Sequence, residues 1–180
     1  MDNEHGAFMA VDYLVKAGHT HIGFISGDIS RLSFKQRLDG YKKALRYHRI
    51  PPHDELICTG GMEKGYDHVH KLLKLKMPPT AIFAANDINA HLGYRAVADA
   101  GYKIPDDISL IGFDDIDLSK MVSPPLTTIR AYKEEMGSIA VRTLLKILDS
   151  NIDNKTTSVV PVKLVERKSV NFMNKQYHSN

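Results

Sequence analysis

Residues 78–115 read PPTAIFAANDINAHLGYRAVADAGYKIPDDISLIGFDD and contain the pattern that decides the fold class. The apolar run at residues 81–84 is typical of a fully buried strand, and a second such run follows at residues 108–113. Between these runs, apolar residues recur at helical spacing over residues 88–97, and Gly101 marks the end of that helix. A strand, a helix and a second strand in this order predict two parallel strands joined by a crossover helix.

The same alternation extends toward the N-terminus. Strands are predicted at residues 22–25 and 56–58, and helices are predicted at residues 3–17, 38–48 and 66–73. Each strand is apolar throughout rather than alternating, so both faces of the sheet are expected to be covered by helices. The sequence therefore predicts an α/β fold whose parallel sheet is flanked by helices on both faces.

The alternation ends after the fourth strand, where residues 114–125 are predicted as a loop. A short extended segment is expected at residues 126–129, followed by a long amphipathic helix at residues 132–148. Residues 158–165 alternate in hydrophobicity, and Pro161 limits them to an edge strand because proline donates no ladder hydrogen bond.

Composition excludes several functional classes. The 180 residues carry a net charge of +3 and are 43% hydrophobic, which fits one globular domain or slightly more and gives no sign of nucleic-acid binding. The single cysteine, Cys58, excludes an intrachain disulfide framework and a multi-cysteine zinc site. No apolar run approaches the roughly 18 residues of a membrane span, and the first residues lack the features of a secretory signal. A cytoplasmic protein without membrane contact is expected.

Polar side chains follow each predicted strand. The carboxyl ends of parallel strands meet at one edge of a sheet, where ligands bind in open α/β folds. Asn86, Asp87 and Asp114 lie at this edge, with Arg31 and Arg37 available for charge-assisted hydrogen bonds. Such groups suit a polyhydroxylated or purine-like ligand, although ordinary solvated loop ends would look the same.

The sequence contains no persuasive catalytic or metal-binding pattern. Neither a glycine-rich nucleotide loop nor a nucleophile elbow occurs. His68 and His70 are two residues apart on a predicted helix and therefore point to different faces. We expect no enzyme activity, no cofactor and no metal.

Several stretches follow one another in a recognisable order. They are AVDYLVKAGH at residues 10–19, RLDGY at 37–41, PTAIFAAND at 79–87, IPDDISLIGFD at 104–114, PPLTTI at 124–129 and ERKS at 166–169. Together they resemble the effector-binding core of the lactose-repressor/galactose-repressor (LacI/GalR) family of transcriptional regulators. The resemblance is collinear over residues 2–170.

The resemblance implies a set of side chains that contact the effector: Asp2, Arg31, Ser33, Arg37, Met62, Asn86, Asp87 and Asp114. In sugar-responsive members, the asparagine at the position of Asn86 bonds sugar hydroxyls. Asp114 matches the effector-binding aspartate of the Gly-Phe-Asp motif, and Asp2 resembles an aspartate near the crossover between lobes. Met62 stands where the family usually has an aromatic residue that stacks on the ligand.

The resemblance also implies a division of the chain within a two-lobe, type I periplasmic-binding-protein-like fold. Residues 1–129 correspond to the second lobe, residues 130–155 to a return helix of the first lobe, residues 156–170 to a strand that crosses back, and residues 171–180 to a polar tail that is expected to fray. The family's helix-turn-helix does not precede Met1, so operator DNA is expected to bind only through a domain absent from this chain. With one wall of the cleft, the chain alone is expected to bind effector weakly or not at all, and a homodimer is expected.

Two other functions remain open at this point. A solute-binding protein of a sugar transport system has the same two-lobe fold, but the stretches at residues 106–114 and 124–129 favour the regulator. An α/β enzyme would need a nucleophile or a metal set, which the sequence does not show.

Overall fold

The computed structural model describes residues 1–61, 64–150 and 157–173. Within these residues, the strands form a single sheet in the order β2-β1-β3-β4-β5-β6. The strands are β1 (Ile22–Ile25), β2 (Ile57–Cys58), β3 (Ala81–Ala84), β4 (Ser109–Asp114), β5 (Thr127–Ala131) and β6 (Val162–Val165). The first five are parallel, and β6 pairs antiparallel with β5 at the edge of the sheet. The predicted α/β class and the predicted edge strand are confirmed.

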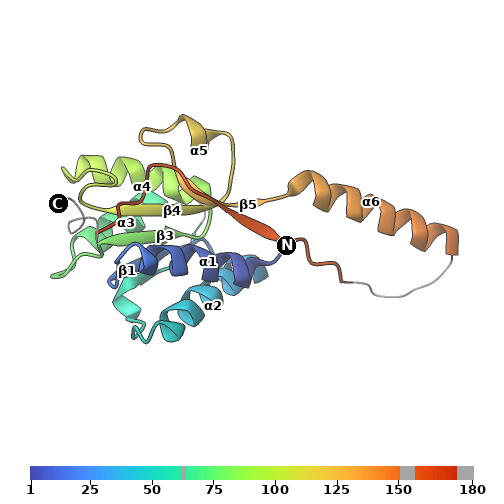
Figure 1. The fold of residues 1–180 in the computed structure, drawn as a ribbon, viewed down its shortest axis with the longest axis horizontal. Helices are drawn as coiled ribbons and strands as arrows, with labels where there is room; N and C mark the ends of the chain where they lie inside the picture. The colour runs from blue at the N-terminus through green and yellow to red at the C-terminus, as the bar shows by residue number, and fades with distance from the viewer. Residues whose placement is uncertain (62–63, 151–156, 174–180) are drawn as a thin grey trace, which may run out of the picture.

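Helices cover both faces of this sheet (Figure 1). They are α1 (Asn3–Lys16) and α2 (Leu32–Tyr47) on one face, and α3 (Gly65–Leu73) and α4 (Asp87–Asp99) on the other. Neighbouring residues of a strand point to opposite faces: Phe24 and Phe83 pack in the cluster with α1 and α2, whereas Ile25 and Ile82 pack in the cluster with α3 and α4. This two-sided burial explains why the strands are apolar throughout.

The structure differs from the sequence-based prediction in several boundaries. Helix α2 begins at Leu32, ahead of the predicted start at residue 38, and Phe34 lies at helical spacing from Leu38 and packs against the same core cluster. The predicted loop after β4 contains the short helix α5 (Leu118–Met121), and a 3-10 helix, η1 (Asp54–Leu56), precedes β2. The edge strand β6 begins at Val162 instead of residue 158, directly after Pro161, whose ring removes the backbone donor that pairing requires.

The segment after β6 is bound more firmly than the polar tail predicted from Asn171 onward. Ser169 Oγ accepts a hydrogen bond from Thr127 N at 2.8 Å. Asn171 N donates to Ser109 Oγ at 2.9 Å, and Met173 N donates to the carbonyl oxygen of Ala17 at 2.8 Å. The expectation of fraying is therefore wrong for residues 171–173, because these contacts are non-local and leave no trace in the sequence pattern. Residues 174–180 lie outside the described residues.

The long helix predicted near residue 132 is confirmed as α6 (Lys133–Ser150), which extends away from the sheet and the other helices (Figure 1). Its exposed apolar side chains are Val141, Leu144, Leu145, Ile147 and Leu148. A groove of about 350 Å³ lies between α6, Met1 and residues 158–160. Among the described residues, no helix combines the length and the apolarity that crossing a membrane requires.

Helices α1 and α2 are in close contact at Gly40, which is buried. A Cβ atom on Gly40 would lie 2.2 Å from the carbonyl oxygen of Glu4 and 2.8 Å from Cβ of Ala7. We expect Gly40→Ala to lower the free energy of unfolding by about 2 kcal/mol, because overpacking a tight contact outweighs the better helix propensity of alanine. Urea unfolding followed by circular dichroism would measure this loss.

Gly137→Ala in α6 is the matched control, because nothing lies within 4 Å of a Cβ atom at that position. This variant should be neutral or stabilised by up to about 1 kcal/mol. Equal unfolding midpoints for the two variants would contradict the close helix approach.

Candidate functional site

The buried guanidinium of Arg37 is the centre of the candidate site at the carboxyl ends of β1, β3 and β4. Its side chain is 5% exposed. Nη2 donates to Asp114 Oδ1 at 3.1 Å, Nε donates to Asn3 Oδ1 at 3.0 Å, and Nη1 donates to the carbonyl oxygen of Ala85. The guanidinium carbon also lies 3.7 Å from the centre of the Phe113 ring, which allows a cation–π interaction. Arg37 therefore joins α1, α2, β3 and β4 at one point.

Charge and burial oppose each other in the pair formed by Arg37 and Asp114. Burial lowers the pKa of Arg37, and the charge of Asp114 acts against this. Burial likewise raises the pKa of Asp114, against the attraction and hydrogen bond of Arg37. The Asp114 side chain is still 25% exposed, so its carboxylate is accessible to a small ligand that offers hydrogen-bond donors.

The backbone at the end of β4 has an uncommon conformation. Asp114 and Asp115 have positive φ angles of 114° and 51°, a region that residues other than glycine rarely adopt. Asp115 does not face Arg37; its carboxylate accepts hydrogen bonds from Arg130 Nε at 2.6 Å and Arg167 Nη2 at 2.5 Å. Burial acts to raise the pKa of Asp115, but the hydrogen bonds and charges of Arg167 and Arg130 outweigh burial and hold this pKa below its usual value. The sequence motif thus places two carboxylates side by side with different partners.

Asp87 is completely buried and is hydrogen-bonded by other parts of the chain. Its Oδ1 accepts from Thr128 Oγ1 at 2.6 Å, and its Oδ2 accepts from Ser119 Oγ at 2.7 Å and Ile116 N at 3.0 Å. Burial raises the pKa of Asp87 to about 6. The described contacts of Asp87 are all internal and fix the loop after β4, whereas its contact with an effector stays a prediction.

The remaining predicted residues lie at helix starts along the same edge. Asn86 is half-buried and caps α4 by accepting from Asn89 N at 3.1 Å. Arg31 is exposed and precedes α2, and Ser33 lies half-buried in the first turn of α2. Met62 lies outside the described residues.

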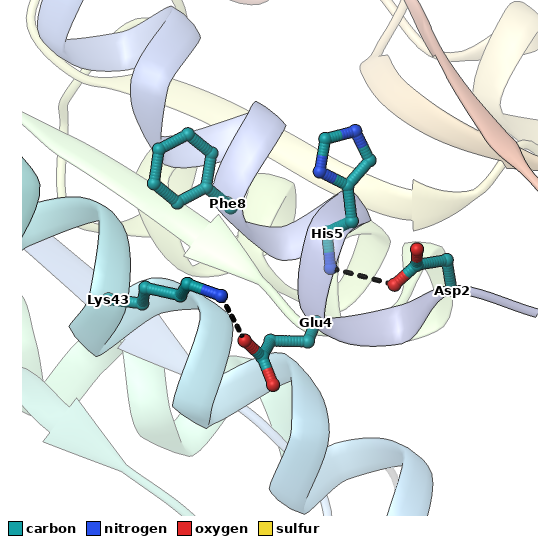
Figure 2. A pocket seen from close by; sticks show the side chains of 5 residues that line it. All are labelled: Asp2, Glu4, His5, Phe8 and Lys43. Carbon is teal, nitrogen blue, oxygen red and sulfur yellow. Dashed lines mark hydrogen bonds and ion pairs between the residues drawn. The ribbon is translucent and has the colours of Figure 1, made fainter.

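Asp2 caps α1 by accepting from His5 N at 3.1 Å. With Glu4, His5, Phe8 and Lys43 it lines an open pocket of about 410 Å³, across which Lys43 Nζ contacts Glu4 Oε1 at 2.6 Å (Figure 2). This pocket does not include Arg37 or Asp114. Asp2 is instead linked to the site through its neighbour in the chain, Asn3, whose side chain accepts from Arg37.

The structure thus brings Arg37 and Asp114 into direct contact and sets Asn86 and Asp87 on the adjacent strand end. Sequence reasoning missed Asn3, Arg130 and Arg167, because their roles depend on contacts between distant segments. In the described part of the chain, no group of three or more histidine, cysteine or acidic side chains is arranged to hold a metal ion.

The chain is similar to a described protein family and to repressors of known sequence. Residues 11–170 match the family described as a periplasmic binding protein-like domain. The chain is 36% identical over 173 residues to the HTH-type transcriptional repressor PurR of Mannheimia succiniciproducens, which is 94% of this chain and 52% of the relative. It is 37% identical over 167 residues to the ribose operon repressor of Haemophilus influenzae, with coverages of 92% and 50%. The chain therefore spans about half the length of these repressors, which are not enzymes.

Solved structures of LacI-type regulators also superpose on this chain. A LacI-type regulator from Bacillus cereus subsp. cytotoxis superposes with a TM-score of 0.91 at 29% identity, over 95% of this chain and 61% of that one. A LacI family regulator from Enterococcus faecium with bound ribose gives 0.85 at 28% identity, with coverages of 96% and 64%. The Lac repressor dimer bound to operator and the anti-inducer ONPF gives 0.86 at 32% identity, with coverages of 95% and 59%.

Proposed function

Because the chain belongs to the periplasmic binding protein-like family, in the form found in LacI-type transcriptional regulators, we propose that it senses a small-molecule effector within such a regulator. The relatives named above are repressors, which favours a regulator over a solute-binding protein of a transport system. The effector is a sugar or a related small polar molecule.

The observation that carries this proposal is the contact between Arg37 and Asp114 at the carboxyl edge of the sheet. A buried cation and a partly exposed carboxylate there supply fixed hydrogen-bond donors and acceptors, and Asn86 lies on the neighbouring strand end. Hydroxyl groups of a sugar both donate and accept hydrogen bonds, so they match this set. The bound ribose of the Enterococcus faecium regulator supports the same ligand class.

The arrangement of α6 supports the proposed division of the chain. We propose that residues 1–129 form one lobe and that residues 130–155 belong to a second lobe, reached through residues 156–170. Helix α6 follows β5 directly and extends away from the sheet (Figure 1). It exposes apolar side chains, which a further lobe would cover.

The partners of the whole regulator follow from the same proposal. Operator DNA would be bound through a domain outside this sequence, and the regulator would act in the cytoplasm as a homodimer. The dimer described for the Lac repressor supports this assembly.

Titration of the isotope-labelled 180-residue chain with D-ribose, cellobiose and adenine, followed by amide NMR, tests the proposal. Any sugar that binds the chain alone is expected to do so with a Kd of about 1 mM, a weak affinity that corresponds to about 4 kcal/mol of binding free energy. Saturable shifts should appear at Arg37, Asn86 and Asp114, and Asp114→Asn should weaken binding about tenfold by removing a charged acceptor.

Asp117→Asn is the matched control, because Asp117 is an exposed carboxylate on the same loop and, among the described residues, its side chain pairs with Lys120 alone, at 3.1 Å. This variant should bind the sugar like the wild type. Saturable shifts confined to residues away from Arg37, Asn86 and Asp114, or equal binding by Asp114→Asn and wild type, would overturn the proposed site.

A further inference from the structure

Asp114 and Asp115 are adjacent in the chain, yet their carboxylates bind different parts of the molecule. Asp114 accepts from Arg37 of α2 at 3.1 Å, within the candidate site. Asp115 accepts from Arg130 and Arg167, which lie on the other side of the turn. One peptide unit therefore separates a candidate ligand contact from a buried ion cluster.

The two arginines that bind Asp115 belong to the chain segments that lead to and from α6. Arg130 lies in β5, the strand that precedes α6. In the sheet, Arg130 is paired in register with Asp114 of β4. Arg167 follows β6, which returns the chain from α6 (Figure 1). The segment that leads into α6 and the segment that returns from it therefore both donate hydrogen bonds to the carboxylate of Asp115.

The cluster around Asp115 is held on several sides. The Asp115 side chain is only 3% exposed and the Arg167 side chain 13%. Arg167 also donates from Nη1 to the carbonyl oxygen of Leu126 at 2.7 Å and from its backbone N to Thr127 Oγ1 at 2.9 Å. Charge-assisted bonds are about twice as strong as neutral ones, so we expect a displacement of Asp115 to be passed on to both segments.

We propose that Asp115 is a positioning residue that couples the hydrogen-bonding state of Asp114 to the segments at each end of α6. The inference rests on the proposed function, in which Asp114 contacts the effector. An effector hydroxyl that competes with Arg37 for Asp114 changes the turn at the end of β4, where Asp114 and Asp115 both have positive φ angles. Because coupling is reciprocal, a shift of β5 and β6 also changes the affinity of Asp114 for its ligand.

A double-mutant cycle on the 180-residue chain tests this coupling without any effector. Amide hydrogen exchange would be measured at residues 127–131 and 162–165 in the wild type, Asp114→Asn, Asp115→Asn and the double variant. We expect each single variant to raise exchange there by about tenfold, the equivalent of 1.4 kcal/mol. In the Asp115→Asn background, Asp114→Asn should add less than about twofold, because the route between the two sites is already broken.

Control measurements separate coupling from general destabilisation. Asp117→Asn should leave exchange at these residues unchanged, and the amides of β1 should exchange equally in every variant. If Asp115→Asn does not fold, Arg130→Gln takes its place in the cycle. The Arg130 side chain is 40% exposed, and after its replacement the buried carboxylate of Asp115 is still paired with Arg167.

Additive effects in the cycle, or an Asp114→Asn variant with wild-type exchange in β5 and β6, would overturn the coupling. These results would leave sugar binding at Asp114 intact. Conversely, a chain that binds no sugar can still show the coupling, so the two failures are distinguishable.

Discussion

Replacement of Arg37 by leucine is expected to lower the free energy of unfolding by about 3 kcal/mol or more, a large part of the stability of a typical domain. Leucine fills much of the apolar volume beside Phe113 but offers none of the donors. Asp114, Asn3 and the carbonyl oxygen of Ala85 would then lose a partner inside the protein. The partly buried carboxylate of Asp114, left without its cation, is the costliest of these losses.

Urea unfolding at pH 7 would measure this effect, with Lys35→Leu as the control. Lys35 lies on the same helix, its side chain is 63% exposed, and within the described part of the chain it pairs with Asp39 alone, at 3.3 Å. Its replacement should change stability by less than about 0.5 kcal/mol. If Arg37→Leu were as stable as the wild type, the guanidinium would not be the centre of the site.

The local pattern of the sequence was sufficient to predict the fold class and most elements. Runs such as residues 81–84 are buried on both faces, so their composition alone indicates the position of a strand between two helix layers. Helix α5 was missed because four residues cannot display a helical period. The first turn of α2 was missed although Phe34 continues the apolar face, while Leu32 is exposed and does not face the core. The firm attachment of residues 171–173 depends on Ala17 and Ser109, which are far away in sequence.

The candidate site was predictable at the level of strand ends but not at the level of bonds. Parallel topology alone brings Asn86 and Asp114 to one edge. It does not reveal that Asp87 is enclosed by the chain while Asp114 remains partly exposed, since both are aspartates after apolar strands. That distinction comes from Ser119 and Thr128, which approach Asp87 from elements distant in the sequence.

Because Asp87 is buried, its titration should make the stability of the protein fall as the pH rises. Its pKa is raised from 3.8 to about 6, so the folded state binds the proton more tightly than the unfolded state does. The stabilisation is therefore fully present below about pH 4 and is lost as the pH rises through about 6. At 1.36 kcal/mol per pKa unit, the difference amounts to about 3 kcal/mol.

Asp87→Asn should abolish this dependence, since asparagine stays neutral and has nearly the same shape. Its carbonyl oxygen can accept from Ile116 N and Ser119 Oγ, while its amide donates to the hydroxyl of Thr128. We expect the free energy of unfolding of the wild type, relative to the variant, to decrease by up to about 3 kcal/mol between pH 4 and pH 7 in urea unfolding experiments. Asp117→Asn, whose side chain is 88% exposed, should show no such trend relative to the wild type. A difference between the wild type and Asp87→Asn that stays constant over this pH range would show that Asp87 has the same proton affinity in the folded and unfolded states.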